Sequence, residues 1–157
     1  MSFVSHKHTS LLHVCCAALM ALLLVLQFLP FWSCETQTVS ILGYICEPLE
    51  FGDITVAIGD AVPDFVVNNI VLQPVLIFLL SLAGTVCCLI WRKNPLTALI
   101  PAACGLIGIW SFSTNPALQL GSNWGLHLLV CILILAAAVI SVILNFQTIK
   151  AYWKSTR

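Results

Sequence analysis

The chain has 157 residues, of which 61% are hydrophobic and only 8% are charged. A soluble domain of this length carries about a quarter charged residues, so its own core could not bury this much apolar surface and lipid must cover the rest. The formal net charge is zero, and no basic run is long enough to bind nucleic acid, so a soluble domain and a nucleic-acid-binding protein are both excluded.

The first predicted element is a transmembrane helix over about 11–32, a stretch without a charged residue. A helix crosses the roughly 30 Å of membrane hydrocarbon with about 20 apolar residues. A cleaved signal peptide is the alternative, but a signal core has only about 7–15 apolar residues and ends in small residues. This stretch ends in Phe31 and Trp32, so we expect it to remain as a span.

The loop over 33–64 is the only sizeable segment that we expect outside the lipid. Apolar residues alternate along 39–46 and along 54–58, with Gly and Pro signals between the two stretches. This period of two predicts two short strands and therefore a small β-hairpin lying over the bundle. We predict a disulfide between Cys34 and Cys46, because the outer side is oxidising; two free thiols are the alternative.

All six acidic residues of the chain lie in this loop, between Glu35 and Asp64. Carboxylates are good calcium ligands, so one interpretation is a cation site. The spacing matches no EF-hand loop, however. The simpler interpretation is that the acids keep the loop soluble, because Lys and Arg are kept out of short outer loops.

Three further transmembrane helices are predicted over about 65–91, 96–112 and 124–146. Pro74 and Pro101 fall inside two of them, and we expect kinks there because neighbouring helices can satisfy the freed carbonyls. The connection between the second and third spans is so short that these two must be antiparallel neighbours. Small residues in the third and fourth spans should let their backbones approach closely.

The basic residues predict how the spans are oriented, since Lys and Arg stay on the cytosolic side of short loops. All six lie in the N-terminal segment, the turn after the second span, or the C-terminal tail: Lys7, Arg92, Lys93, Lys150, Lys154 and Arg157. Four spans put these three segments on one side, so both termini are predicted to be cytosolic. The tryptophans, which prefer membrane interfaces, fit this orientation, with Trp32, Trp110 and Trp124 outside and Trp91 and Trp153 inside. The chain has no Asn-x-Ser/Thr sequon, which agrees with a bacterial cytoplasmic membrane.

Asn68, Asn69 and Gln73 form the most polar stretch of any span, in the outer part of the second helix. A shallow polar pocket opening outward is one interpretation, and hydrogen bonding between helices is the other. His13 and His127 lie near opposite membrane faces and therefore cannot share a metal ion. We expect each to be an interfacial or a hydrogen-bonded histidine.

The six cysteines outside the outer loop all lie in the spans, and no Cys-x-x-Cys pair occurs. The cysteine spacing typical of metal and redox sites is therefore missing, and we expect these six cysteines to pack as small buried residues. Palmitoylation of Cys88, near the cytosolic boundary, is the alternative.

Known four-span families fit poorly. Claudin-like proteins share the four spans and the larger first outer loop, but here Trp32 is followed at once by Cys34, and the segment 43–46 lacks the second tryptophan of their signature. Small multidrug transporters need a glutamate within the membrane, and no predicted span contains one. We assign no family.

The sequence therefore predicts an all-α membrane protein, a single four-helix bundle domain over 1–157 with a small outer loop. We expect a non-enzymatic accessory or interaction subunit, in which the acidic loop contacts a protein partner or a second copy within the lipid bilayer. The alternative is a small transporter or permeability protein with a polar site at Asn69 and Gln73. No catalytic residue, metal or cofactor is predicted, because the outer loops lack His, Lys and Arg and the cytosolic segments are too short to build a site.

Overall fold

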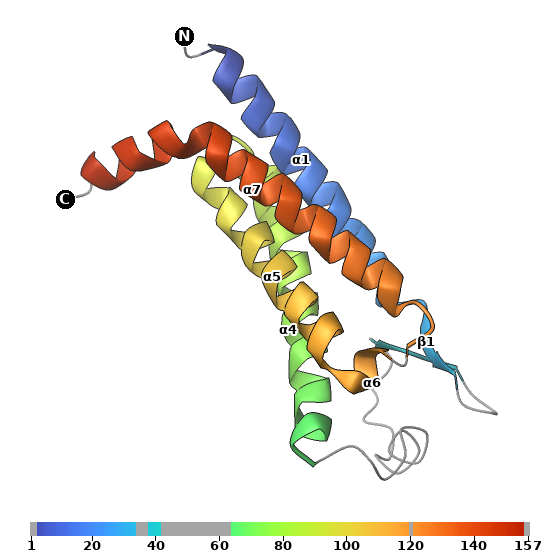
Figure 1. The fold of residues 1–157 in the computed structure, drawn as a ribbon. Coiled ribbons are helices and arrows are strands. Elements are labelled where there is room, and N and C mark those ends of the chain that lie inside the picture. Colours follow the sequence, from blue (N-terminus) through green and yellow to red (C-terminus); the bar gives the residue numbers. More distant parts are fainter. Residues whose placement is uncertain (1–2, 34–37, 42–63, 120, 156–157) are drawn as a thin grey trace.

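The computed structural model describes residues 3–33, 38–41, 64–119 and 121–155. Four long helices dominate these residues (Figure 1). In chain order the elements are α1 (Phe3–Leu26), β1 (Pro30–Ser33), β2 (Thr38–Ser40), α4 (Asp64–Ile90), the 3₁₀ helix η1 (Pro95–Ala98), α5 (Leu99–Thr114), α6 (Pro116–Gln119) and α7 (Trp124–Ser155).

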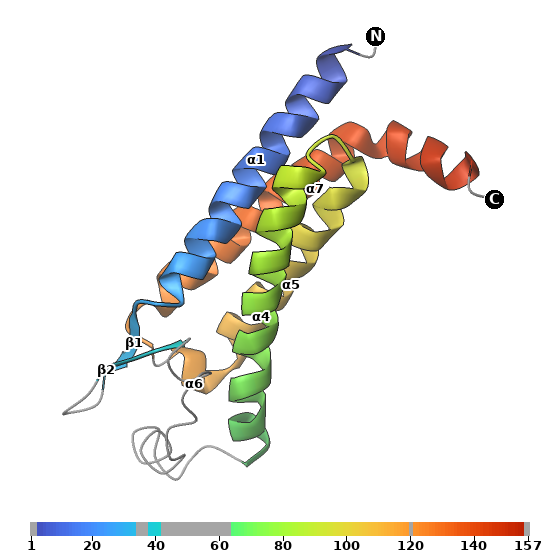
Figure 2. The same cartoon turned by 180° about the vertical axis from the view of Figure 1, so that it is seen from behind.

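Each long helix packs against two others in a closed arrangement. Helix α7 contacts α1 and α5, and α4 contacts the same two helices from the other side, so that α1 and α5 lie diagonally opposite. Helices α4 and α5 are antiparallel neighbours joined by the turn over 91–94, as predicted (Figure 2). The long helices therefore enclose one interior, which large apolar side chains such as Met20, Leu23, Ile77 and Ile134 fill.

Three helical segments in the described part of the chain are long and apolar enough to cross a membrane: 73–90, 96–114 and 124–146. They match the second, third and fourth predicted spans. The apolar stretch of α1 is shorter and covers Ser10–Leu26. At about 1.5 Å per residue it measures roughly 25 Å, slightly less than the membrane hydrocarbon.

The predicted C-terminal boundary of the first span, near Trp32, is wrong. Helix α1 ends at Leu26, and the next three backbone N–H groups bond carbonyls three residues back in a tightened last turn. Pro30 explains the end, because proline cannot continue the hydrogen-bond ladder and disfavours a helical conformation in the residue before it. The chain then continues as strand β1.

Strand β2 begins one residue before the stretch 39–46 that was predicted to form a strand, but its partner differs from the predicted one. It pairs antiparallel with β1, and the register joins Trp32 to Val39 and Ser33 to Thr38, with an irregularity between Pro30 and Trp32. The stretch 54–58, which was predicted to form the second strand, lies outside the described residues. The partner of β2 is therefore β1, which precedes it in the chain by a short connection.

The two predicted kink prolines differ in their placement. Pro74 lies inside α4, as predicted. Pro101 lies in the first turn of α5, directly after η1, and not in the interior of a helix. The N–H groups in the first turn of a helix have no partner within that helix, and the missing N–H of proline therefore costs little there.

The small residues of α5 bring its backbone against α7, as predicted. A Cβ added to Gly105 would lie 2.9 Å from the backbone nitrogen of Leu135, and one added to Gly108 would collide with the Cys131 sulfur. These two glycines therefore set how closely α5 and α7 approach.

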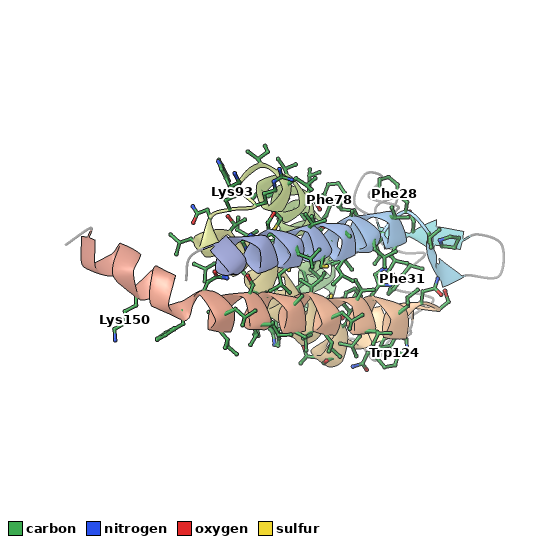
Figure 3. All side chains as sticks on the ribbon, turned by 90° about the horizontal axis from the view of Figure 1, so that it is seen from above. Phe28, Phe31, Phe78, Lys93, Trp124 and Lys150 are labelled. Atoms are coloured by element: carbon green, nitrogen blue, oxygen red, sulfur yellow. The ribbon has the colours of Figure 1, made fainter. Side chains whose placement is uncertain are left out.

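The two ends of the bundle carry different structures. Both chain termini and the turn between α4 and α5 lie at one end, and β1, β2 and α6 lie at the other (Figures 1 and 2). The C-terminal part of α7 turns away from the bundle at the first end, where the exposed Lys150 is found (Figures 1 and 3). We call the end with the termini the basic end and the other the strand end.

Candidate functional site

Strand β1 is attached to the turn that precedes α7. The backbone N–H of Ser122 donates to the Phe31 carbonyl at 2.8 Å, and the Asn123 side-chain amide donates to the Pro30 carbonyl at 3.1 Å. These bonds join segments about ninety residues apart in the sequence. They hold the start of the acidic loop against the strand end of the bundle.

Phe31 fills the space beneath this attachment. Its side chain is fully buried and points between α1 and α7, whereas Phe28 points outward (Figure 3). A Cβ on Gly121 would collide with the Phe31 ring, so the turn needs a glycine there. The ring also meets His127 edge-on at a centroid distance of 5.1 Å.

His127, in the first turns of α7, packs against two phenylalanines, Phe31 of β1 and Phe112 of α5. Its ring centroid lies 5.2 Å from that of Phe112, whose ring also meets Phe31 edge-on at 6.3 Å, and its Nδ1 lies 2.9 Å from the Asn123 carbonyl. A carbonyl only accepts, so Nδ1 carries the proton, and in the neutral ring Nε2 is an acceptor. The Leu26 carbonyl comes near the ring, but no described group forms a geometrically acceptable hydrogen bond with Nε2.

Two further buried polar side chains in the described residues have atoms without a hydrogen-bond partner. They are Gln27, just beyond the end of α1, and Ser111, on α5. Together with His127 they form the set that we call the polar cluster. Sequence reasoning missed Gln27 and Ser111, although Gln27 is one of only two strongly polar residues in the stretch 11–29 and that contrast was a usable signal.

The predicted polar stretch of α4 is placed only in part. Asn68 and Asn69 lie in the first turns of α4, but their side chains lie outside the described part of the structure. Gln73 is buried, and its Oε1 accepts a 3.1 Å hydrogen bond from the Asn115 side-chain amide. The Gln73 amide therefore joins α4 to the segment after α5, as the helix-to-helix interpretation expects, and Asn115 is a partner that sequence reasoning missed.

His13 forms a second polar contact near the basic end. The ring is fully buried; its Nδ1 lies 2.8 Å from the Arg92 carbonyl and its Nε2 lies 3.3 Å from the Ser141 hydroxyl. Since the carbonyl requires Nδ1–H, the Ser141 hydroxyl donates to Nε2 in the neutral ring. The prediction of a hydrogen-bonded histidine is confirmed for His13, which connects α1, the α4–α5 turn and α7.

The predicted interfacial tryptophans that the structure describes are exposed. Trp91 lies at the basic end, Trp110 one turn before the end of α5, and Trp124 at the start of α7, where it points away from the bundle (Figure 3). The side chains of Trp32 and Trp153 lie outside the described residues.

The cysteines do not form a shared site in the described residues, where no group of three or more metal-ligating side chains occurs. Cys88 is fully buried between helices, which contradicts its palmitoylation because an acyl chain needs an exposed thiol. Cys34 and Cys46 lie outside the described residues, so their disulfide stays a prediction.

Comparisons with known protein families, with curated proteins and with solved structures give no match.

Proposed function

We propose that this protein spans the membrane four times, with both termini and the α4–α5 turn in the cytosol. The grouping of these three segments at the basic end supports the proposal, because they carry every Lys and Arg of the chain. The tightened turn after Leu26 adds to the length of α1 and would bring it to the outer boundary. A bacterial cytoplasmic membrane fits the lack of glycosylation sequons.

We further propose that the protein acts without catalysis, as an accessory subunit whose acidic outer loop binds a protein partner or a second copy. The observation that carries this proposal is the attachment of β1 to the turn before α7, through the Ser122 and Asn123 hydrogen bonds. It fixes against the bundle the residues of β1, which directly precede the acidic segment in the sequence. A loop anchored in this way loses less conformational freedom on binding than a free one.

Affinity purification from native membranes tests this function. Replacing Glu47 and Glu50 by Gln should lower recovery of a stoichiometric partner about tenfold, the change that a loss of about 1.4 kcal/mol of binding free energy gives. The matched control, Lys93→Gln with Lys150→Gln, neutralises two exposed charges at the basic end and should leave recovery unchanged. Equal recovery from both variants, or no stoichiometric partner with the unaltered chain, would contradict the proposal.

A small transporter or permeability protein is the second candidate. The sequence suggests Asn69 and Gln73 for such a site, but the Gln73 side-chain oxygen accepts a hydrogen bond from the Asn115 amide. The observation that favours this candidate is instead the polar cluster of Gln27, Ser111 and His127, which has buried polar atoms without a hydrogen-bond partner among the described residues.

A further inference from the structure

The three side chains of the polar cluster are as deeply buried as any apolar residue of the interior. Gln27 is 1% exposed, and Ser111 and His127 are each 0% exposed. Within the described part of the chain, four of their polar atoms lack a hydrogen-bond partner: both side-chain atoms of Gln27, the Ser111 hydroxyl and His127 Nε2. Buried polar groups are almost always hydrogen-bonded, and an orphaned one costs about 1–3 kcal/mol.

The packing of α5 against α7 places two members of the cluster at the same level of the bundle. These helices are antiparallel, and Gly108 of α5 lies against Cys131 of α7. One turn toward the strand end from that contact brings the chain to Ser111 on α5 and to His127 on α7. The ring contact between His127 and Phe112 confirms this alignment, because Phe112 directly follows Ser111.

Gln27 reaches the same level from α1. The carbonyl of the preceding Leu26 comes near the His127 ring, and Phe31, four residues beyond Gln27, packs on that ring. Two helices and the turn that follows α1 thus bring one polar side chain each to one layer. The contact of Gly108 with Cys131 lies next to this layer on the side of the basic end, and the contact of Phe31 with Gly121 lies next to it on the side of the strand end.

The free atoms define what would bind among them. His127 Nε2 needs a donor, Gln27 offers an N–H donor and an oxygen acceptor, and the Ser111 hydroxyl can do either. A single partner must therefore both donate and accept. The side chains seen to pack on the His127 ring, Phe31 and Phe112, are aromatic and uncharged, so an ion beside the ring would find no counter-charge in them and would incur a large desolvation cost.

We propose that the polar cluster binds a small neutral molecule that carries both a hydrogen-bond donor and an acceptor. Water has this chemistry and bridges otherwise unsatisfied buried groups with about three hydrogen bonds. A small alcohol or amide solute has it too. This inference is independent of the accessory function, because it concerns the interior of the bundle and not the outer loop.

The sign of a stability change tests the proposal. If a molecule is bound, Gln27→Met and Ser111→Ala each remove one of its partners and should lower Tm by about 2–4 °C in detergent. If the polar atoms are simply unsatisfied, the same replacements should raise Tm, because an orphaned group has been removed. Ser81→Ala is the control, since the Ser81 hydroxyl is buried but bonds the Phe78 carbonyl in its own helix.

Solid-state NMR on the unaltered protein in bilayers gives a second measurement that does not depend on a variant folding. Magnetisation transfer from water to the Gln27 side-chain amide, with the Gln73 amide as the comparison, would identify water as the bound molecule. A saturable rise in Tm with glycerol or acetamide that Gln27→Met abolishes would identify a solute. Raised Tm in both variants, with neither water transfer nor a saturable solute effect, would overturn the proposal.

Discussion

His13 shows at the scale of one residue how a buried polar group can connect three segments of the bundle. Its two ring nitrogens reach the Arg92 carbonyl and the Ser141 hydroxyl at the same time. Replacement by Ala would leave both partners without it and open a cavity among packed helices. We expect His13→Ala to destabilise the protein by about 2–4 kcal/mol, in the range of other buried large-to-small changes.

Thermal unfolding in detergent measures this loss. Ser141→Ala removes only one of the two bonds and should cost about 0.6 kcal/mol, the average for hydrogen bonds inside membrane bundles. Cys15→Ala, at an exposed neighbouring position, should change stability by less than about 0.5 kcal/mol. A His13→Ala variant as stable as the Cys15 control would show that the ring does not hold the helices together.

Gln73 and Asn115 allow the helix-joining and transport interpretations to be separated. If their hydrogen bond only joins helices, a double-mutant cycle with Gln73→Leu and Asn115→Leu should give a coupling of about 0.6 kcal/mol. The companion change of Asn69 and Gln73 to Leu should then leave folding and partner binding nearly intact. A variant that folds normally yet loses a measured flux or growth phenotype would favour transport instead.

At the scale of the element, α5 and α7 approach closely because glycine leaves room for backbone. A methyl group at Gly105 would meet the Leu135 backbone, which cannot rotate away as a side chain can. We expect Gly105→Ala to cost about 1–3 kcal/mol, the usual range for overpacking. Gly125→Ala is the matched control in α7, where an added Cβ meets nothing within 4 Å, and it should be neutral or slightly stabilising. Equal effects of the two changes in a thermal melt would contradict this account.

The acidic loop carries a covalent prediction of its own. If Cys34 and Cys46 face an oxidising compartment, they should form a bridge worth on the order of 3 kcal/mol. Non-reducing peptide mapping should find Cys34 joined to Cys46 and the other six cysteines free. Alkylation of both without prior reduction would exclude the bridge.

At the scale of the whole molecule, the two ends of the bundle should face different compartments. Single cysteines at Gln119 and Lys93, introduced after Cys34 and Cys46 are changed to Ser, report on the two ends. A membrane-impermeant maleimide added to intact cells should label Gln119→Cys but not Lys93→Cys. Lys93 suits this test better than Asn94, whose side chain caps η1 by accepting from the Leu96 N–H. Labelling at position 93 from outside would reverse the proposed orientation.

The sequence by itself determined where three of the long helices lie. The predicted range 65–91 agrees closely with α4, the range 96–112 with η1 and α5 taken together, and the range 124–146 with the apolar part of α7. The reason is that hydrocarbon thickness sets the length of an apolar helix, and a backbone in lipid must satisfy its own hydrogen bonds. The short turn over 91–94 likewise required α4 and α5 to be antiparallel neighbours.

Only the tertiary structure decided which polar side chains face the interior and which segments pair. Helices that are apolar on every side do not show in sequence which face is buried, so Gln27, Ser111 and Asn115 were missed as members of the interior. Strand β2 pairs with β1 and not with the predicted stretch 54–58. Strand β1 is also attached to Ser122 and Asn123, about ninety residues away in the chain. Such contacts follow from how the helices are rotated and packed, which spacing along the chain does not encode.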